Sequence, residues 1–246
     1  MKVLDLDLDC FIEGIAHYAS DNGARLDDQE HPPWNESRFR NFLENRCGLS
    51  RSQPINGRVF TRHVEIFGYW RGLIDSGRLT IPFSVTHVDA HSDMGLGGFA
   101  PNHICQELLP LPPGERIRSG EALRHLDSGS FLAYALAFRW ISDLTFVHHI
   151  DYLDGDDFVG DFFKDNNPFD SGIIELKRFR ISEIPLPQEN RVLLTKDPDI
   201  PFQLISVDNY QNAGGFDYAT ICQSPGFTPE SADVLLDVFR EYIIET

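Results

Sequence analysis

The sequence predicts an α/β protein in which helices cover both faces of a mostly parallel β-sheet, a three-layer αβα arrangement. Segments with the apolar spacing of strands alternate along the chain with segments that have the spacing of helices. Acidic residues gather where two predicted strands end, as expected if the carboxyl ends of parallel strands form a site. The chain has no internal repeat and no linker, so residues 1–246 are expected to form a single domain.

The first half of the chain is expected to contain two strands and two helices. Residues 3–11 alternate apolar and acidic side chains, which is typical of a strand. Residues 35–47 begin with a capping asparagine and stop before a glycine, so they are expected to form a helix. A second helix is expected over residues 64–76, and a strand over residues 79–89. The polar segments expected to be loops are residues 21–34 and 49–58.

In the second half of the chain, predicted helices and strands continue to alternate. A helix is expected over residues 129–142 and a strand over residues 144–150. Thr228 is expected to cap a final helix with Pro229 in its first turn. Three more segments are expected to be strands: residues 173–179, 202–207 and 218–222. The segments expected to be loops are the glycine-rich residues 95–101, the proline-rich residues 109–118 and the acidic residues 151–170.

Composition excludes several classes of protein. With 21 basic and 38 acidic residues the formal charge is −17, which disfavours nucleic acid and anionic membranes as partners and favours cationic ligands. No apolar run approaches the roughly 18 residues that a membrane span needs. Aspartates interrupt the apolar N-terminus, so a signal peptide is not expected. The four cysteines are widely spaced, and we expect reduced thiols in the cytoplasm.

The most informative motif follows the predicted strand at residues 79–89. Asp89, His91 and Asp93 alternate along the chain, so on extended backbone their side chains point to the same side. A single Asp or His at this position usually caps a helix or closes a turn. Three together, next to a glycine-rich loop, are typical ligands of a divalent cation.

A second acidic row lies near the N-terminus. Asp5, Asp7 and Asp9 share one side of the first predicted strand, where like charges repel unless cations neutralise them. A solvated edge strand would also tolerate this row. The flanking apolar residues favour burial, and therefore metal binding, and the sequence leaves open whether Asp5 replaces Asp9 as a ligand.

Four histidines have weaker assignments. His63 lies ahead of the second predicted helix, and a single histidine there is as compatible with packing as with function. His103 follows the glycine-rich loop and is either a proton shuttle or an ordinary loop residue. His148 and His149 end a predicted strand, where packing is the simpler role than support of a metal site.

Together these motifs resemble the arginase (ureohydrolase) superfamily. Residues 88–93, Val-Asp-Ala-His-Ser-Asp, are similar to its Asp-Ala-His-x-Asp signature. Residues 7–11, Asp-Leu-Asp-Cys-Phe, are similar to its Asp-x-Asp-x-Phe segment. Residues 221–229 resemble an atypical branch of the arginase/deacetylase fold that includes bacterial peptide arginases, which convert arginine in ribosomally made peptides to ornithine.

The resemblance implies a site with two Mn²⁺ ions per chain. Its six ligands would be Asp7, Asp9, His63, Asp89, His91 and Asp93. Asp89 and Asp7 would bridge the ions, with His63 and Asp93 on one and His91 and Asp9 on the other. Carboxylate-rich ligation suits Mn²⁺ better than Zn²⁺. The resemblance also implies that Asp93 takes the proton of the nucleophile, with His103 as a shuttle.

Two departures from ordinary arginases shape the prediction. Their Asp-x-Asp segment comes late in the chain, whereas here it is N-terminal, so the strand order must be permuted. Their guanidinium-binding glutamate has no counterpart in residues 221–223, and Asp208, after the predicted strand at residues 202–207, is the substitute we predict. The loops that clamp a free amino acid are also unrecognisable, which favours an arginine-containing precursor peptide as the partner.

Three alternatives stay open. A zinc-dependent deacetylase of the same fold needs only one Asp-x-His pair and one further aspartate, and one bound zinc per chain would favour it. A ureohydrolase of free arginine or agmatine would use the same ligands. A non-catalytic metal-binding module is disfavoured, because structural sites prefer closed Cys/His ligand sets.

Overall fold

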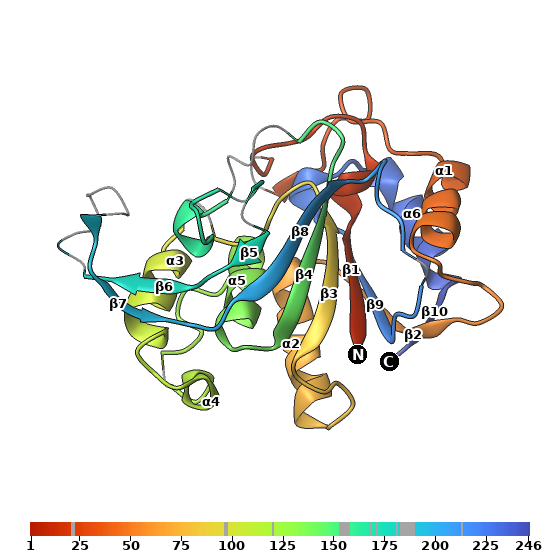
Figure 1. Cartoon of the computed structure of the whole chain (residues 1–246). Helices are drawn as coiled ribbons and strands as arrows, with labels where there is room; N and C mark the ends of the chain where they lie inside the picture. Colours follow the sequence, from red (N-terminus) through yellow and green to blue (C-terminus); the bar gives the residue numbers. More distant parts are fainter. Residues whose placement is uncertain are drawn as a thin grey trace.

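The computed structural model describes residues 1–20, 23–95, 98–119, 121–152, 158–167, 169–170, 172–180, 182, 190–212 and 214–246. Within these residues one large sheet contains β1 (Lys2–Asp7), β2 (Ile55–Phe60), β3 (Phe83–Asp89), β4 (Ile141–His148), β5 (Ile173–Ile174), β8 (Ile200–Ser206), β9 (Tyr218–Cys222) and β10 (Ile243–Glu245). Their order is β10-β2-β9-β1-β3-β4-β8-β5 (Figure 1). All neighbours are parallel except β5, which runs antiparallel to β8. The predicted α/β class with a mostly parallel sheet is confirmed.

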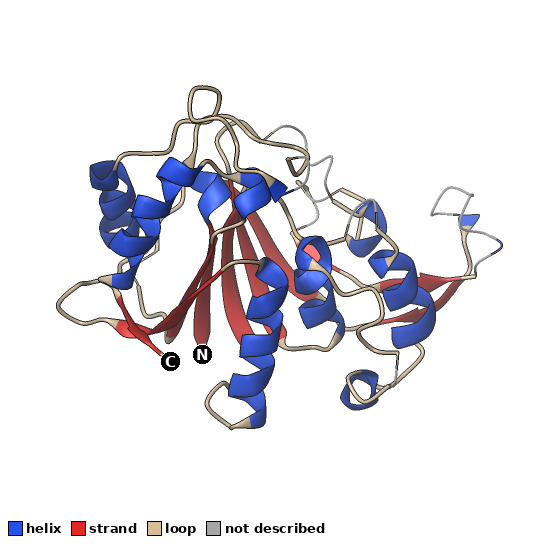
Figure 2. Ribbon diagram, turned by 180° about the vertical axis from the view of Figure 1, so that it is seen from behind, coloured by secondary structure: helices blue, strands red, loops and turns tan. Residues whose placement is uncertain are grey.

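Helices lie on both faces of this sheet, as a three-layer fold requires. They are α1 (Glu36–Asn41), α2 (His63–Asp75), α3 (Ala100–His103), α4 (Pro113–Arg116), α5 (Phe131–Ala137) and α6 (Val234–Arg240). Figure 2 shows helices on both sides of the sheet. On one face, Trp70 of α2 and Phe131 of α5 belong to the core that includes Val85 of β3. On the other, Phe39 of α1 and Leu235 of α6 belong to the core that includes Leu6 of β1.

The central strands bring three acidic or polar side chains into one row on the α2 face. Asp5 of β1 pairs in register with His87 of β3 on one side and with Thr220 of β9 on the other. Two residues further along β1, at its carboxyl end, Asp7 pairs with Cys222. Alternation therefore places one polar row inside the sheet and a second row at its carboxyl edge.

The prediction of a loop holds for residues 49–54 and is wrong from Ile55, where β2 begins. Gly57 packs closely inside the sheet. A Cβ on Gly57 would lie 2.3 Å from the carbonyl oxygen of Ala219 and 2.7 Å from the side chain of Ile243. Glycine therefore permits β2 to fit between β9 and β10. The C-terminal strand β10 was also missed by the sequence prediction.

Several predicted elements are shorter in the structure. β1 ends at Asp7, whose side chain accepts a hydrogen bond from the backbone of Asp9 and starts a 3₁₀ turn. The helix expected over residues 129–142 ends at Ala137, because Arg139 adopts a φ of +61° and turns the chain toward β4. The helix expected from residue 35 to 47 is α1 continued by the π-helical turn Phe42–Arg46.

The expected strand at residues 173–179 is divided, because its two halves pair with different partners. β5 joins the large sheet, whereas β6 (Lys177–Phe179) pairs with β7 (Leu193–Lys196), which was not predicted, in a separate two-stranded sheet. Thr228 does not cap the last helix, since its hydroxyl donates to the carbonyls of residues 223 and 224. The segment that follows is the 3₁₀ turn Glu230–Asp233, which leads into α6.

Parts of the expected loops contain short helices. α3 begins within residues 95–101, and α4 lies within residues 109–118. The acidic segment 151–170 includes the 3₁₀ turn Gly160–Phe162, and its residues 153–157 and 168 lie outside the described residues, as do residues 21–22 and 96–97 of the other expected loops. Among the helices described, none combines the length and the apolar character that crossing a bilayer requires.

Candidate metal centre

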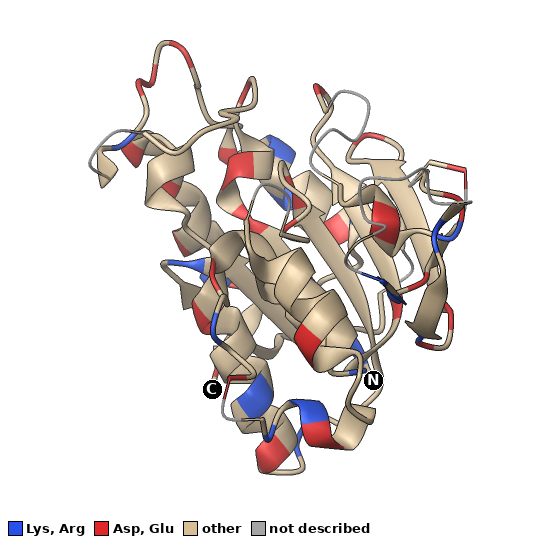
Figure 3. Cartoon of the chain, turned by 90° about the vertical axis from the view of Figure 1, so that its left-hand side faces the viewer, with Lys and Arg blue, Asp and Glu red and all other residues tan. Residues whose placement is uncertain are grey.

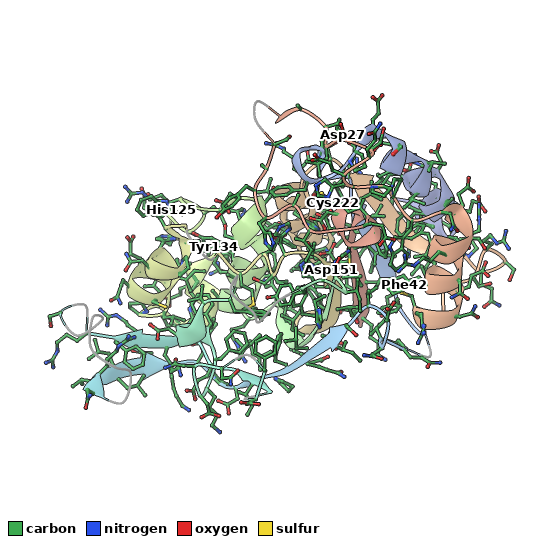
Figure 4. The ribbon with its side chains drawn as sticks, turned by 90° about the horizontal axis from the view of Figure 1, so that it is seen from above. Asp27, Phe42, His125, Tyr134, Asp151 and Cys222 are labelled. Carbon is green, nitrogen blue, oxygen red and sulfur yellow. The ribbon has the colours of Figure 1, made fainter. Side chains whose placement is uncertain are left out.

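The carboxyl edge of the sheet gathers side chains from segments far apart in the sequence. Asp7 is the last residue of β1 and Asp89 is the last residue of β3. His63 opens α2, directly after β2, and therefore reaches the same edge. Because β1 lies between β9 and β3, the sheet order itself brings these residues together. Figure 4 looks down on this edge, with Cys222 of β9 near its middle.

His63 is the centre of one group of ligands. Its Nδ1 lies 2.9 Å from Oδ2 of Asp93, 3.0 Å from Oδ2 of Asp7 and 3.4 Å from Oδ2 of Asp89. Asp93 reaches this position with a φ of +51°, a left-handed conformation that Asp tolerates better than most residues. One imidazole nitrogen thus faces three carboxylate oxygens, an arrangement that suits a shared cation.

His91 is the centre of a second group. Its Nδ1 lies 2.9 Å from Oδ2 of Asp9 and 3.8 Å from Oδ1 of Asp89. The backbone N–H of His91 donates to Oδ1 of Asp89 at 2.7 Å, and that of Ala90 donates to Oδ1 of Asp9 at 3.2 Å. These bonds hold the turn after β3 against the turn after β1.

The two groups share Asp89. The ligand atoms of Asp9, Asp89 and His91 lie within 4.8 Å of one another, and so do those of His63, Asp89 and Asp93. Asp7 lies on the His63 side, together with Cys222. The structure therefore brings together all six residues predicted as ligands, with Asp89 between the two groups. It groups Asp7 with His63, whereas the sequence prediction placed Asp7 between the two ions.

Burial and mutual repulsion shift the pKa values of the carboxylates in this cluster. Burial, followed by the charges of Asp9, Asp7 and Asp93, raises the pKa of Asp89 well above its ordinary value. Burial and the charge of Asp9 also raise the pKa of Asp7. Burial would raise the pKa of Asp9 as well, but its hydrogen bond with His91 and the charge of that histidine lower it. Positive charge is needed here to keep these carboxylates ionised.

Unsatisfied polar atoms gather in the same place. Among the described residues, eight buried side-chain N or O atoms have no hydrogen-bond partner, and four of them surround this cluster: His63 Nε2, His87 Nε2, Asp89 Oδ2 and Asp93 Oδ2. Buried polar atoms are normally paired, so such a concentration indicates a missing binding partner. Carboxylate and imidazole donors of this kind fit Mn²⁺ or a similar divalent cation.

Without a bound cation, we predict that the protein loses stability as the pH rises from 6.5 to about 9. Burial lowers the pKa of His91, but its hydrogen bond with Asp9 and the nearby aspartates outweigh this and raise the pKa from 6.5 to about 9. The folded chain thus holds this proton more tightly than the unfolded chain. The proton on His91 contributes fully to the free energy of unfolding below pH 6.5, and this contribution disappears as the pH rises through about 9.

A divalent cation at the same atoms should replace this proton and weaken the pH dependence. Denaturant unfolding over this pH range, with and without Mn²⁺, measures both effects. An unfolding free energy of the cation-free chain that rises between these pH values would contradict the prediction.

A cleft of about 620 Å³ opens above the cluster. Its lining residues are Asp7, Asp9, His17, Tyr18, His63, Asp89, His91, Ser92, Asp93, Gly95, Ser128, Gly129, Ser224 and Phe227. None of these described lining residues is Lys or Arg. A separate cavity of about 180 Å³ beside Cys105 and Lys177 contains none of the predicted ligands.

Two predicted site residues are not brought to this cleft. His103 is buried in α3, where its Nδ1 and the hydroxyl of Tyr134 are 2.8 Å apart and its ring meets that of His125. Tyr134 and His125 lie to one side of Cys222 in Figure 4. Asp208 is exposed after β8, and β4 and β3 separate that strand from β1. Neither residue lines the described cleft.

The other two histidines fit the expected packing role. Nε2 of His149 donates to the carbonyl of Ile12 at 2.9 Å, and its Nδ1 accepts from the backbone of Asp151 at 3.0 Å. His149 therefore ties the end of β4 to the segment after β1. Nδ1 of His148 donates to the carbonyl of His149 at 2.8 Å.

Sequence reasoning missed three residues at this site. The hydroxyl of Ser224 donates to Oδ2 of Asp7, and the ring of Phe227 lies 4.9 Å from that of His91. His87 lies beneath the cluster, with its Nε2 3.2 Å from Oδ2 of Asp89. Because His87 precedes Asp89 by two residues, period-2 alternation could have identified it, whereas the two others required the fold.

No protein-family model, no curated protein and no solved structure matches this chain.

Proposed function

We propose that this protein is a Mn²⁺-dependent hydrolase that converts arginine side chains within a peptide to ornithine and releases urea. The observation that carries the proposal is the pair of ligand groups sharing Asp89, one centred on His63 and the other on His91. A carboxylate between two such groups is suited to bridge two divalent cations. The number and identity of the ions are part of the proposal.

When bound, two such cations supply a water molecule whose pKa is lowered toward neutrality. In the overall reaction the water oxygen bonds to the guanidinium carbon, the bond from that carbon to Nε of the substrate breaks, and both water protons end on the departing nitrogen. Asp93 would move one of these protons, because it lines the cleft and is the most accessible of the four clustered carboxylates, at 9% exposure.

The charge around the cleft supports a cationic substrate. The chain has 38 acidic and 21 basic residues, a net charge of −17, and acidic positions are spread over the ribbon in Figure 3. The described lining offers no Lys or Arg to hold the α-carboxylate of a free amino acid. An arginine within a peptide lacks that carboxylate, and the open cleft leaves room for its backbone.

We predict that the Mn²⁺-loaded protein releases urea faster from arginine within a peptide than from free arginine. Free arginine must desolvate its α-carboxylate beside a described lining that offers no Lys or Arg to pair with it, a cost that a blocked peptide does not have. We expect at least about a tenfold difference in kcat/KM, which corresponds to about 1.4 kcal/mol. The measurement compares urea release from free arginine, agmatine and a blocked arginine peptide, with mass spectrometry to detect ornithine. Faster turnover of free arginine would contradict the peptide preference, and no urea from any substrate would contradict the function.

The second candidate is a deacetylase with one Zn²⁺. The group of Asp9, Asp89 and His91 favours it, because two aspartates and one histidine complete such a site without His63. Release of acetate from acetyl-lysine peptides by a chain with one zinc ion would identify this activity.

The cytoplasm is the location we propose for this reaction. Cys10, Cys47, Cys105 and Cys222 are all free thiols, as expected in a reducing compartment.

A further inference from the structure

Asp5 is a carboxylate that the proposed reaction does not use. It is fully buried in the middle of β1, one residue pair below the edge of the cleft, and does not line the cleft. A buried charge of this kind is costly unless its neighbours satisfy it. Its presence in the central strand of the sheet therefore needs a reason other than solvation.

The neighbours of Asp5 form one polar row across three strands. The hydroxyl of Thr220 donates to Oδ1 of Asp5 at 2.7 Å, and Nδ1 of His87 donates to Oδ2 at 2.9 Å. All three side chains are fully buried. The hydrogen bond to Asp5 places the ring N–H hydrogen of His87 on Nδ1. Nε2 is then unprotonated, and its lone pair is directed to the cluster above.

The second histidine above Asp5 is His63. Its Nε2 lies 3.7 Å from Oδ2 of Asp5, whereas its Nδ1 faces the carboxylates of Asp7, Asp89 and Asp93. Histidines that bind metals commonly present their other ring nitrogen to a carboxylate, which sets the tautomer and the ring orientation. Asp5 has the position of such a carboxylate.

Rings on either side leave these histidines little freedom to rotate. His63 stacks on Phe131 with 5.0 Å between ring centroids, and His87 stacks on Phe146 with 5.6 Å. His87 Nε2 is 3.2 Å from Oδ2 of Asp89, and neither atom has a hydrogen-bond partner. Because the Nδ1–H of His87 is directed to Asp5, His87 Nε2 and Asp89 Oδ2 are two acceptors in contact. A nearby cation would stabilise this contact.

Asp5, His63 and His87 form a further group whose ligand atoms lie within 4.8 Å of one another. Since both nitrogen-to-carboxylate contacts of this group come from below the cleft, we propose that Asp5 is a positioning residue that orients His63 for metal binding and His87 toward the cluster, and that it is not itself a ligand. The proposal rests on the metal site of the proposed function. The sequence left open whether Asp5 replaces Asp9 as a ligand. The proposal favours Asp9, because Asp9 lines the cleft beside His91, whereas Asp5 lies below the histidines.

The test measures Mn²⁺ affinity, not urea release. Mn²⁺ is titrated into the metal-free full chain against a competing chelator, for the unaltered protein and for Asp5→Asn. We expect Asp5→Asn to weaken Mn²⁺ binding about 10–100-fold, the effect typical of removing such a supporting carboxylate. The matched control is Asp143→Asn, the same change on β4, where the carboxylate accepts hydrogen bonds from Ser84 and Ser142. This change should leave the affinity unchanged.

A second variant keeps the proposal testable if Asp5→Asn alone does not fold. Asp5→Asn/His87→Phe removes the buried pair and places a third aromatic ring beside Phe131 and Phe146. If Asp5→Asn alone does not fold, the double variant should fold and still bind Mn²⁺ at least about tenfold more weakly. A folded variant with unchanged affinity would overturn the proposal.

Failure of the proposed function gives a different result. An unaltered chain that binds Mn²⁺ but releases no urea would contradict the function and leave the role of Asp5 in place. An unaltered chain that binds no divalent cation would overturn both.

Discussion

Asp89→Ala should abolish Mn²⁺ binding and urea release together. Asp89 is the residue that the two ligand groups share, with Oδ1 near His91 and Oδ2 near His63. Cations of this kind lower the activation barrier of hydrolysis by several kcal/mol. Each 1.4 kcal/mol is a factor of ten, so the loss in kcat/KM should be at least about a thousandfold. Metal analysis of the desalted protein and urea release measure the two effects.

The control for this variant is Asp237→Ala. Asp237 is exposed on α6, on the opposite face of the sheet from His63, and pairs with Arg240. Its loss should change neither the metal content nor the rate. If Asp89→Ala kept its full metal content, the ligand assignment would be wrong, whatever happened to activity.

His63→Ala and His91→Ala should each reduce the metal content from two ions per chain to one. The reason is that each histidine serves only one of the two groups. Because the nucleophile needs both ions, each variant should also lose at least about a hundredfold in kcat. Elemental analysis gives the number of ions, and urea release gives the rate.

His125→Ala is the control for the two histidine variants, since His125 contacts His103 and Phe99 and does not line the cleft. A His63→Ala protein that retains one zinc ion and releases acetate from acetyl-lysine peptides would favour the one-zinc alternative, in which only Asp9, Asp89 and His91 are needed.

The sequence predicted the site better than it predicted the element boundaries. The close spacing of Asp89, His91 and Asp93 identified one half, because that signal is local to a few residues. The expected extended backbone is wrong, since β3 ends at Asp89 and Asp93 has a φ of +51°, so the three side chains converge through a turn. The pairing of this half with Asp7 and Asp9 depended on the position of β1 between β9 and β3, which no local pattern specifies. The resemblance of two short motifs supplied that link, and the structure places the residues accordingly.

Contacts between segments that are distant in the sequence could not be predicted from local patterns. Ser224 meets Asp7 only because β9 lies beside β1, and His87 meets Asp5 only through strand register. Conversely, His103 and Asp208 were placed at the site from their nearness in sequence to loops or strand ends. The fold buries the first beside Tyr134 and leaves the second exposed.

The strand β2 shows the same limit at the level of the fold. The Asn-Gly pair in its sequence, Ile-Asn-Gly-Arg-Val-Phe, is typical of a turn. The glycine is needed because Ala219 and Ile243 lie close on neighbouring strands. Packing across the sheet, which local propensity does not contain, decides its conformation.

The central claim is a two-metal site that shares Asp89. Anomalous diffraction from crystals of the Mn²⁺-loaded protein, recorded at the manganese edge, tests it most directly. We predict two peaks about 3.5–4 Å apart, one beside His63 and Asp93 and the other beside His91 and Asp9. A single peak between Asp9, Asp89 and His91, or no peak at the carboxyl edge of the sheet, would contradict the account.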